Sequence, residues 1–316
     1  MDTRRLGTSD LEVGVIGLGC VGMSAEYDPS EQDDRRSIRV LARAVDRGVT
    51  LFDTADVYGP FTNEALLGRG LRPYRERVTI ATKCGLVVDP VSGNEVPDGH
   101  PTHVQRACRG SLARLGLDVI DLYHLHRVDP AVPIEESWGA MATLVEQGLV
   151  RHIGLSEVDV ATLERAHAIH PVASVQSELS LWTRGPLAEV LPWCRTNGAG
   201  FLPYAPLGRG FLTGAIAAAR FADDDIRATN PRFTPEAIAA NLRLVDVLRD
   251  IAGSLGATPA QVALAWLLTR GDGVVPIPGT KRPERLDENC AAADLVLPAA
   301  AVARLDALPE PVGARY

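Results

Sequence analysis

The sequence of 316 residues contains no long hydrophobic run and little cysteine. No apolar stretch approaches the ~18 residues that a membrane-spanning helix needs. The first seven residues lack the apolar segment of a secretory signal. The five cysteines are odd in number and scattered, and their spacing matches neither a metal site nor a redox motif. These absences predict a cytoplasmic protein without a bound metal or a membrane partner.

The chain also lacks an excess of basic residues. Its 32 Lys and Arg residues are outnumbered by 40 Asp and Glu residues, so the net charge is −8. This balance argues against nucleic acid as the main partner. No stretch rich in proline or serine divides the chain, and 46% of the residues are apolar, enough for a large core. We therefore expect one domain over residues 1–316.

Short apolar runs alternate with amphipathic segments along the whole chain. This alternation predicts a parallel α/β fold, and eight repeats predict a closed (β/α)8 TIM barrel. Arg4–Glu12 is expected to form a hairpin that plugs the bottom of the barrel. Long loops are expected at the opposite, C-terminal face, above all 208–231, whose length is typical of a functional loop. The predicted barrel strands are 13–18, 51–53, 77–83, 119–126, 151–156, 172–178, 200–204 and 273–277.

Helix starts are marked by residues that can cap free backbone N–H groups. Ser30 is expected to cap a helix that stops at Gly48, and Thr102 with Gln105 forms a capping box for a helix that runs to about Leu115. Further predicted caps are Asp159, Thr234 before Pro235 and Thr258 before Pro259. Ile216–Arg220, inside the long loop, is a candidate for a short helix.

Gly17, Gly19 and Gly22 match the G-x-G-x-x-G pattern of dinucleotide-binding Rossmann domains. The context does not fit, because no helix follows Gly22 at once. The acid about 20 residues further on is also missing from a strand end, since Asp46 lies within a predicted helix. The glycines instead allow the backbone to approach a ligand at the mouth of the first strand.

Three charged or titratable residues end predicted strands, namely Asp53, Lys83 and His126, and Tyr58 follows closely in the chain. In a barrel these ends meet at the C-terminal rim, where active sites lie. Each residue alone has an ordinary explanation as a cap, a rim charge or a core histidine. Together they favour a catalytic site.

The chemistry that fits these four residues is reduction of a carbonyl group. A hydride must reach the carbonyl carbon while a proton reaches its oxygen, and a phenol with a pKa of ~10 is a poor donor at neutral pH. Lys83 is expected to lower the pKa of Tyr58 by stabilising the phenolate, and Asp53 to hold Lys83 in place. His126 is expected to donate a hydrogen bond to the carbonyl oxygen and orient the substrate.

The sequence resembles the aldo-keto reductases over nearly its whole length. The resemblance implies a (β/α)8 barrel and a tetrad of Asp53, Tyr58, Lys83 and His126, with His126 rather than His124 as its histidine. The sequence motifs are most similar to those of the branch of general aldehyde and pyridoxal reductases. The matching stretches are Gly17-Leu18-Gly19-Cys20, Phe52-Asp53-Thr54-Ala55 with Tyr58-Gly59, Thr82-Lys83, Asp121-Leu122-Tyr123 with His126, Gly154-Leu155-Ser156, Tyr204-Ala205-Pro206-Leu207-Gly208 and Ile277-Pro278-Gly279-Thr280.

The resemblance also implies NADPH/NADP+ as the cofactor, laid across the barrel mouth. Ser156 and Gln176 would hold the carboxamide, and Tyr204 would stack on the nicotinamide ring. The remaining implied contacts are Gly19 and Cys20 at the mouth of the first strand, Leu207, Gly208 and Arg209 on the pyrophosphate, Thr280, Lys281 and Arg285 on the 2′-phosphate, and Glu288 and Asn289 on the adenine. Glu157 stands where many members have asparagine, so it is a weaker candidate ligand than Ser156.

The substrate is expected to be a small carbonyl compound whose identity the sequence leaves open. Tyr27, Val57 and Trp182 are candidates for apolar walls of its site, with ordinary loop packing as the alternative. The implied oligomeric state is a monomer or a small homo-oligomer. The favoured direction of the reaction in the cell is also left open.

Three other functions compete with the reductase. The first is a non-catalytic NADPH-sensing or regulatory subunit, as the potassium-channel beta subunits partly are. The second is a zinc hydrolase that uses His124 and His126. The third is a Schiff-base aldolase that uses Lys83, in which Asp53 and Tyr58 lose their joint role.

Overall fold

The computed structural model describes residues 1–27 and 29–315, and its centre is a sheet of seven parallel strands. The strands follow the spatial order β11-β10-β9-β8-β5-β4-β3 and form a nearly closed barrel. An α/β barrel is therefore confirmed. The strand bounds are β3 Leu18–Gly19, β4 Leu51–Asp53, β5 Thr79–Cys84, β8 Ile120–Leu125, β9 Val150–Ser156, β10 Ser174–Glu178 and β11 Gly200–Tyr204.

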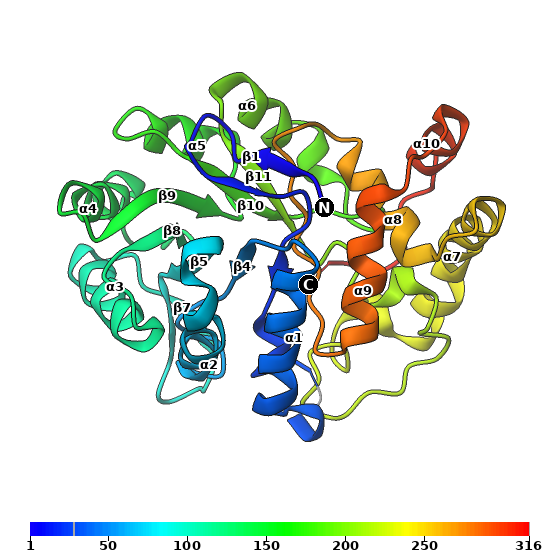
Figure 1. The fold of residues 1–316 in the computed structure, drawn as a ribbon, viewed down its shortest axis with the longest axis horizontal. Helices are drawn as coiled ribbons and strands as arrows, with labels where there is room; N and C mark the ends of the chain where they lie inside the picture. Colours follow the sequence, from blue (N-terminus) through cyan, green and yellow to red (C-terminus); the bar gives the residue numbers. More distant parts are fainter. Residues whose placement is uncertain (28, 316) are drawn as a thin grey trace.

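Helices surround the strands on the outside (Figure 1). Their apolar faces pack on the barrel, and the largest cluster of buried side chains joins the sheet to α3–α8. Three-residue 3-10 turns lie between several of them. The helix bounds are α1 Asp34–Asp46, α2 Thr62–Leu71, α3 Pro101–Leu115, α4 Ile134–Glu146, α5 Val160–His167, α6 Val190–Asn197, α7 Pro235–Leu255, α8 Pro259–Leu268, α9 Pro283–Ala291 and α10 Ala299–Asp306.

The eighth place in the barrel is filled by residues 273–279, which do not form the regular strand expected over 273–277. Toward β11, Val275 and Ile277 donate backbone hydrogen bonds to Phe201 and Pro203. On the opposite side the N–H groups would belong to residues 276 and 278, and both are proline. Because proline has no N–H, this side can only accept bonds, from Gly17 and Gly19.

The N-terminal hairpin is present and pairs β1 (Thr3–Arg5) with β2 (Glu12–Gly14). Leu6 and Leu11 near its turn are buried in one cluster with barrel residues such as Leu122 and Leu202. The hairpin thus covers the end of the barrel where the strands begin, and Figure 1 shows β1 above the centre of the view, close to the labels of β10 and β11. The expected strand 13–18 is wrong in its first half, because Val13 belongs to β2 and only Leu18 continues into β3.

Three predicted caps are confirmed, and two are wrong. Asp159, Thr234 and Thr258 accept the expected N–H bonds at the starts of α5, α7 and α8. At α1 the cap is Asp33 rather than Ser30, because residues 29–31 form a separate 3-10 turn. At α3 the helix starts at Pro101, one residue before Thr102, so no capping box forms.

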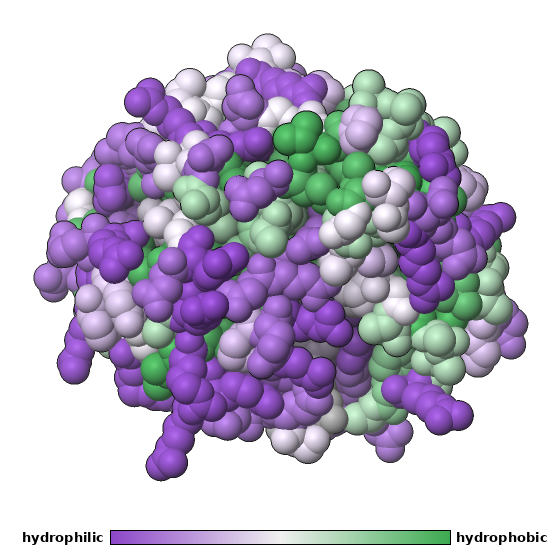
Figure 2. Space-filling view, turned by 45° about the vertical axis from the view of Figure 1, so that its right-hand side comes forward, coloured by the Kyte–Doolittle hydropathy of each residue, from purple (hydrophilic) through white to green (hydrophobic). Residues whose placement is uncertain are grey.

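Two further expectations concern the short helix in the long loop and the absence of a membrane-spanning helix. Ile216–Arg220 is irregular and not helical. Figure 2 shows a face covered mostly by hydrophilic residues, with apolar patches toward its upper and right-hand sides. Within residues 1–27 and 29–315, no single helix is long and apolar enough to span a membrane, although α7 and α8, bent by 90°, meet the length and composition criterion as a pair.

Candidate active site

A cavity of about 1060 Å³ lies at the ends of the strands, opposite the hairpin plug. Its walls come from strand ends, from the hairpin of β6 (Leu86–Val88) and β7 (Glu95–Pro97), and from the long loop 208–231. Ile226 of this loop donates a backbone hydrogen bond of 3.0 Å to the carbonyl oxygen of Glu26, which ties the loop across the opening. The loop expected to be functional therefore forms a wall of the cavity.

The expected ion pair at the strand ends is formed and buried. Lys83 Nζ lies 2.6 Å from Asp53 Oδ1 and also donates to the carbonyl oxygen of Thr54 at 2.8 Å. The other carboxylate oxygen of Asp53 accepts a bond of 2.8 Å from Gln176 Nε2. Lys83 has no exposed surface. Because each charge has a charged or polar partner, the pair is held in one arrangement.

Tyr58 lies beside this pair on the loop after β4. Lys83 Nζ is 3.4 Å from Tyr58 Oη, at the long end of the range for a hydrogen bond. The rings of Tyr58 and His126 meet edge to face, with 5.6 Å between their centroids. Asp53, Tyr58 and His126 line the cavity, and Lys83 supports them from below. The structure thus brings together the four residues predicted as the tetrad.

The pKa of Tyr58 is raised well above 10, which differs from the effect expected of Lys83. Burial is the main cause, and the charge of Asp53 adds to it. Since Asp53 neutralises Lys83 at 2.6 Å, the pair presents little net positive charge to the phenol. Burial and the charge of Lys83 also lower the pKa of His126 well below 6.5. At neutral pH the cavity therefore holds a protonated phenol and a neutral imidazole.

His124 lies in β8, two residues before His126, and beneath the cavity. Its Nε2 is 2.8 Å from Ser174 Oγ, and burial lowers its pKa to about 3. Gly154 leaves room for this ring, because a Cβ there would come within 2.5 Å of His124 Cδ2. Within the described residues no group of three or more His, Cys, Asp or Glu side chains is placed to hold a metal ion. Among the described residues, therefore, no further side chains join His124 and His126 to complete the zinc site of the hydrolase hypothesis.

The residues expected at the nicotinamide, Ser156, Gln176 and Tyr204, all line the cavity next to the tetrad. Ser156 Oγ lies 3.2 Å from Arg127 Nη1, and Tyr204 Oη accepts a bond of 2.7 Å from Arg315. Of the residues expected at the rest of the cofactor, Gly19, Leu207, Arg209, Thr280, Lys281, Arg285 and Asn289 line it as well.

Several candidate residues lie behind the wall instead. Cys20 is fully buried beside Gly19, and Gly208 and Glu288 are not among the lining residues. Of the candidates for the substrate site, only Tyr27 lines the cavity. Val57 is buried next to Leu86, and Trp182 is stacked on Phe211 with 4.3 Å between ring centroids. For these last two residues the structure agrees with ordinary loop packing.

Other lining residues were not singled out from the sequence. Glu26, Glu95, Arg127 and Arg227 contribute charges to the wall. They lie in loops or a short hairpin without helical or strand periodicity. In the sequence, only the position of each loop after a predicted strand could indicate that its residues lie near the site. Arg315 had no signal at all, since no motif surrounds it.

A match to a known protein family shows the class of enzyme, one that reduces carbonyl groups with a nicotinamide cofactor. The model of the Aldo/keto reductase family matches residues 15–310, and the chain belongs to this family. "Probable aldo-keto reductase 1" of Glycine max is 44% identical over 290 residues, which are 91% of this chain and 83% of that protein.

Solved structures agree with this assignment. The glycerol dehydrogenase AKR11B4 from Gluconobacter oxydans is similar with a TM-score of 0.86 at 27% identity, over 96% of this chain and 94% of that one. The thermostable aldo-keto reductase Tm1743, in complex with the inhibitor epalrestat, has a TM-score of 0.78 at 29% identity, over 97% and 99%. The holo form of AKR11C1 from Bacillus halodurans has a TM-score of 0.79 at 25% identity, over 97% and 95%.

Proposed function

We propose that this protein reduces an aldehyde or ketone to an alcohol with NADPH, and that Tyr58 is the general acid. The observation that carries the proposal is the convergence of Tyr58, His126 and the Asp53–Lys83 pair at one end of a cavity whose other end is cationic. Neutral His126 can donate a hydrogen bond to the carbonyl oxygen without taking up the proton itself. Protonated Tyr58 then delivers its proton to that oxygen.

Lys83 acts at the moment when Tyr58 loses its proton. As negative charge develops on Tyr58 Oη, the ammonium group 3.4 Å away stabilises it. Asp53 keeps the ammonium in position through its 2.6 Å contact, and Gln176 holds the second carboxylate oxygen. The burial of the pair excludes water, which strengthens this interaction.

The cavity fits an extended dinucleotide with a terminal phosphate. Its volume of about 1060 Å³ is at the upper end of ordinary ligand pockets. Near the tetrad it offers a hydroxyl and an amide, from Ser156 and Gln176, which suit a carboxamide. At the far end Thr280, Lys281 and Arg285 offer a hydroxyl and two cations at the start of α9. NADPH, when bound, would supply the hydride.

The test uses the purified protein and a panel of aldehydes and ketones, with the loss of NADPH absorbance as the readout. We expect turnover with at least one member. Fluorescence titration at one stated salt concentration should show NADPH bound at least ~10-fold more tightly than NADH, about 1.4 kcal/mol. No turnover across the panel contradicts the reductase, and equal affinity contradicts the choice of cofactor.

A further inference from the structure

The side chain of Arg315 reaches the cavity wall from the segment that follows α10. Its guanidinium donates to three residues at the ends of different strands. Nη2 lies 2.7 Å from Tyr204 Oη, and Nε lies 2.7 Å from Glu178 Oε2. Both carboxylate oxygens of Glu157 accept bonds of 2.8 Å. The fork geometry of arginine suits such a set of partners, which one ammonium could not satisfy equally.

The segment that carries Arg315 is itself fixed. Asn241 in α7 exchanges two bonds with the backbone of Val312, at 2.9 and 2.8 Å. Asn230 donates to the carbonyl oxygen of Arg315 at 3.1 Å. Gly313 has a φ of +97°, and a Cβ there would come within 2.8 Å of the carbonyl oxygen of Pro231.

The two carboxylates beside Arg315 make its charge necessary. Glu178 is buried, and its backbone N–H donates to Glu157 Oε1 at 2.8 Å, so the two side chains are close neighbours. Burial acts to raise the pKa of Glu157, but the hydrogen bond and the charge of Arg315 outweigh it, and the pKa is lowered. Glu157, the residue that departs from the common asparagine, is therefore engaged with Arg315 and Glu178 in this structure.

We propose that Arg315 is a positioning residue that fixes the ring of Tyr204 at the nicotinamide end of the cavity. The inference rests on the proposed function, because Tyr204 has a ligand to face only if a nicotinamide binds there. Tyr204 ends β11, and Ala205 after it has a left-handed backbone with a φ of +45°. The guanidinium of Arg315, which Glu157 and Glu178 anchor, holds the hydroxyl of Tyr204 at 2.7 Å. This contact restricts the ring of Tyr204 to one orientation.

The test compares two probes that share the phosphate end of the cavity but differ at the nicotinamide end. These are NADPH and adenosine 2′,5′-bisphosphate, each titrated calorimetrically. In Arg315→Met we expect the Kd of NADPH to rise about tenfold, while the Kd of the bisphosphate stays within about twofold. Arg304→Met is the matched control, because Arg304 lies exposed on α10 and pairs with Asp250. It should change neither Kd.

A second pair of variants covers the case in which Arg315→Met does not fold. Tyr204→Phe keeps the ring but removes the hydroxyl that Arg315 holds. It should weaken NADPH in the same selective way, and Arg315→Lys should weaken it less than Arg315→Met. Where both fold, the double variant should be no weaker than the worse single variant, because the two changes remove one interaction.

Two failures can be told apart. If the unmutated protein does not bind NADPH, the proposed function fails, and this inference fails with it. If it binds NADPH but Arg315→Met or Tyr204→Phe leaves that Kd unchanged, only the positioning role of Arg315 is wrong. The same holds if both probes weaken equally, since that pattern indicates general damage to the cavity.

Discussion

The two ends of the cavity are built in opposite ways. At the reaction end Lys83 is fully buried, and its partners lie within 2.8 Å on neighbouring strands and the turn after β4. At the other end, which Thr280, Lys281 and Arg285 line and where the phosphate of the proposed cofactor would lie (the phosphate end), Arg285 is 55% exposed and pairs with Glu288 of its own helix at 2.6 Å. Charges at the first end act at short range with little screening by salt, whereas the exposed charge of Arg285 at the second end is screened. Changes at the reaction end should therefore alter the reaction rate and stability, and changes at the phosphate end should alter affinity alone.

The largest expected effect is on stability and comes from Asp56, between Asp53 and Tyr58. Its carboxyl is 3% exposed, and within the described residues Oδ1 has no hydrogen-bond partner. Burial, with the charge of Glu64 second, raises its pKa to about 7. Between about pH 4 and pH 7 the folded state keeps a proton that the unfolded state has lost, so stability falls as pH rises through this window.

The measurement is urea unfolding at several pH values. The fall due to Asp56 should total about 4 kcal/mol, roughly 10³-fold in the folding equilibrium, and level off above pH 7. Asp56→Asn should remove this part of the slope. An unchanged slope in the variant would show that Asp56 ionises without cost and that the reaction end is less rigid than described.

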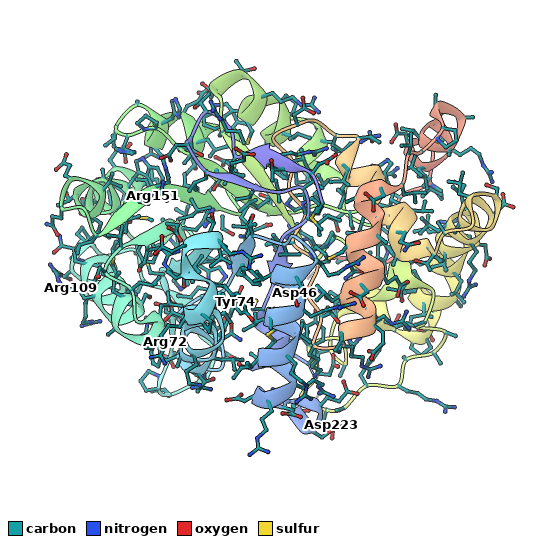
Figure 3. The ribbon with its side chains drawn as sticks, viewed as in Figure 1. Asp46, Arg72, Tyr74, Arg109, Arg151 and Asp223 are labelled. Carbon is teal, nitrogen blue, oxygen red and sulfur yellow. The ribbon has the colours of Figure 1, made fainter. Side chains whose placement is uncertain are left out.

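The next effect is the loss of the proton donor. Tyr58→Phe should lower kcat on the order of 10²-fold or more, because a positioned acid is removed, while the Kd of NADPH stays within about twofold. Tyr74→Phe is the control, since Tyr74 lies on the turn after α2 and is not among the residues that line the cavity (labelled in Figure 3). Near-normal turnover in Tyr58→Phe would contradict the proposal that Tyr58 is the general acid.

Removal of Lys83 should have a smaller effect on rate. Lys83→Met leaves the phenol without its cation, so kcat should fall about 30-fold with cofactor quenching of fluorescence retained. Asp53→Asn should act in the same direction more mildly, because Lys83 keeps its bond to Thr54. Circular dichroism checks the fold of both. Full activity in whatever fraction folds would mean that the pair has a structural role only.

At the phosphate end the expected effects are on affinity. Lys281→Ala and Arg285→Ala should each weaken NADPH about threefold to tenfold and change NADH little, because only the 2′-phosphate is in question. The loss should shrink at high salt, since Arg285 is exposed. If a variant binds both dinucleotides more weakly by the same factor, the cation that was replaced contacts a part of the cofactor other than the 2′-phosphate.

The smallest expected effect has the opposite sign. Glu31 contacts Arg282 at 2.7 Å and Lys281 at 3.6 Å, so it competes with a bound phosphate for cations. Glu31→Gln should tighten NADPH about twofold to threefold and leave NADH unchanged. Asp287→Asn is the matched control, because Asp287 pairs with Arg43 of α1 and with Arg47, the residue after α1. Weaker NADPH binding in Glu31→Gln would indicate that Glu31 supports the site.

The sequence predicted the reaction end better than the rest of the site. Strand-end positions placed Asp53, Lys83 and His126 on one rim because parallel strands share a direction. The raised pKa of Tyr58 could not be predicted in this way, since it depends first on how deeply the folded chain buries the phenol and then on the nearby charge of Asp53. The rejection of a Rossmann domain agrees with the structure, in which Asp46 ends α1 (Figure 3).

Elsewhere prediction failed where periodicity is absent. The loop 208–231 has no repeat of apolar residues, so its path across the cavity depends on tertiary contacts such as that of Ile226 with Glu26. Arg315 is 137 residues from Glu178 in the chain, and local pattern cannot show such a contact. The regular strand predicted over 273–277 was wrong for a different reason, because Pro276 has no N–H group to donate to a neighbouring strand.

These two prolines make one line of the barrel weaker than the others. Along it, Gly17 and Gly19 donate to Pro276 and Pro278, and neither proline has an N–H group to donate in return. This half-bonded line runs along the floor of the cavity, where Gly19, Ile277 and Gly279 are exposed to a ligand. The barrel should therefore open locally between β3 and residues 276–279. The backbone amide hydrogen of Gly19 should then exchange with solvent faster than that of Phe52 in β4. A long ligand lying over this line would brace it, so filling the cavity should slow that exchange.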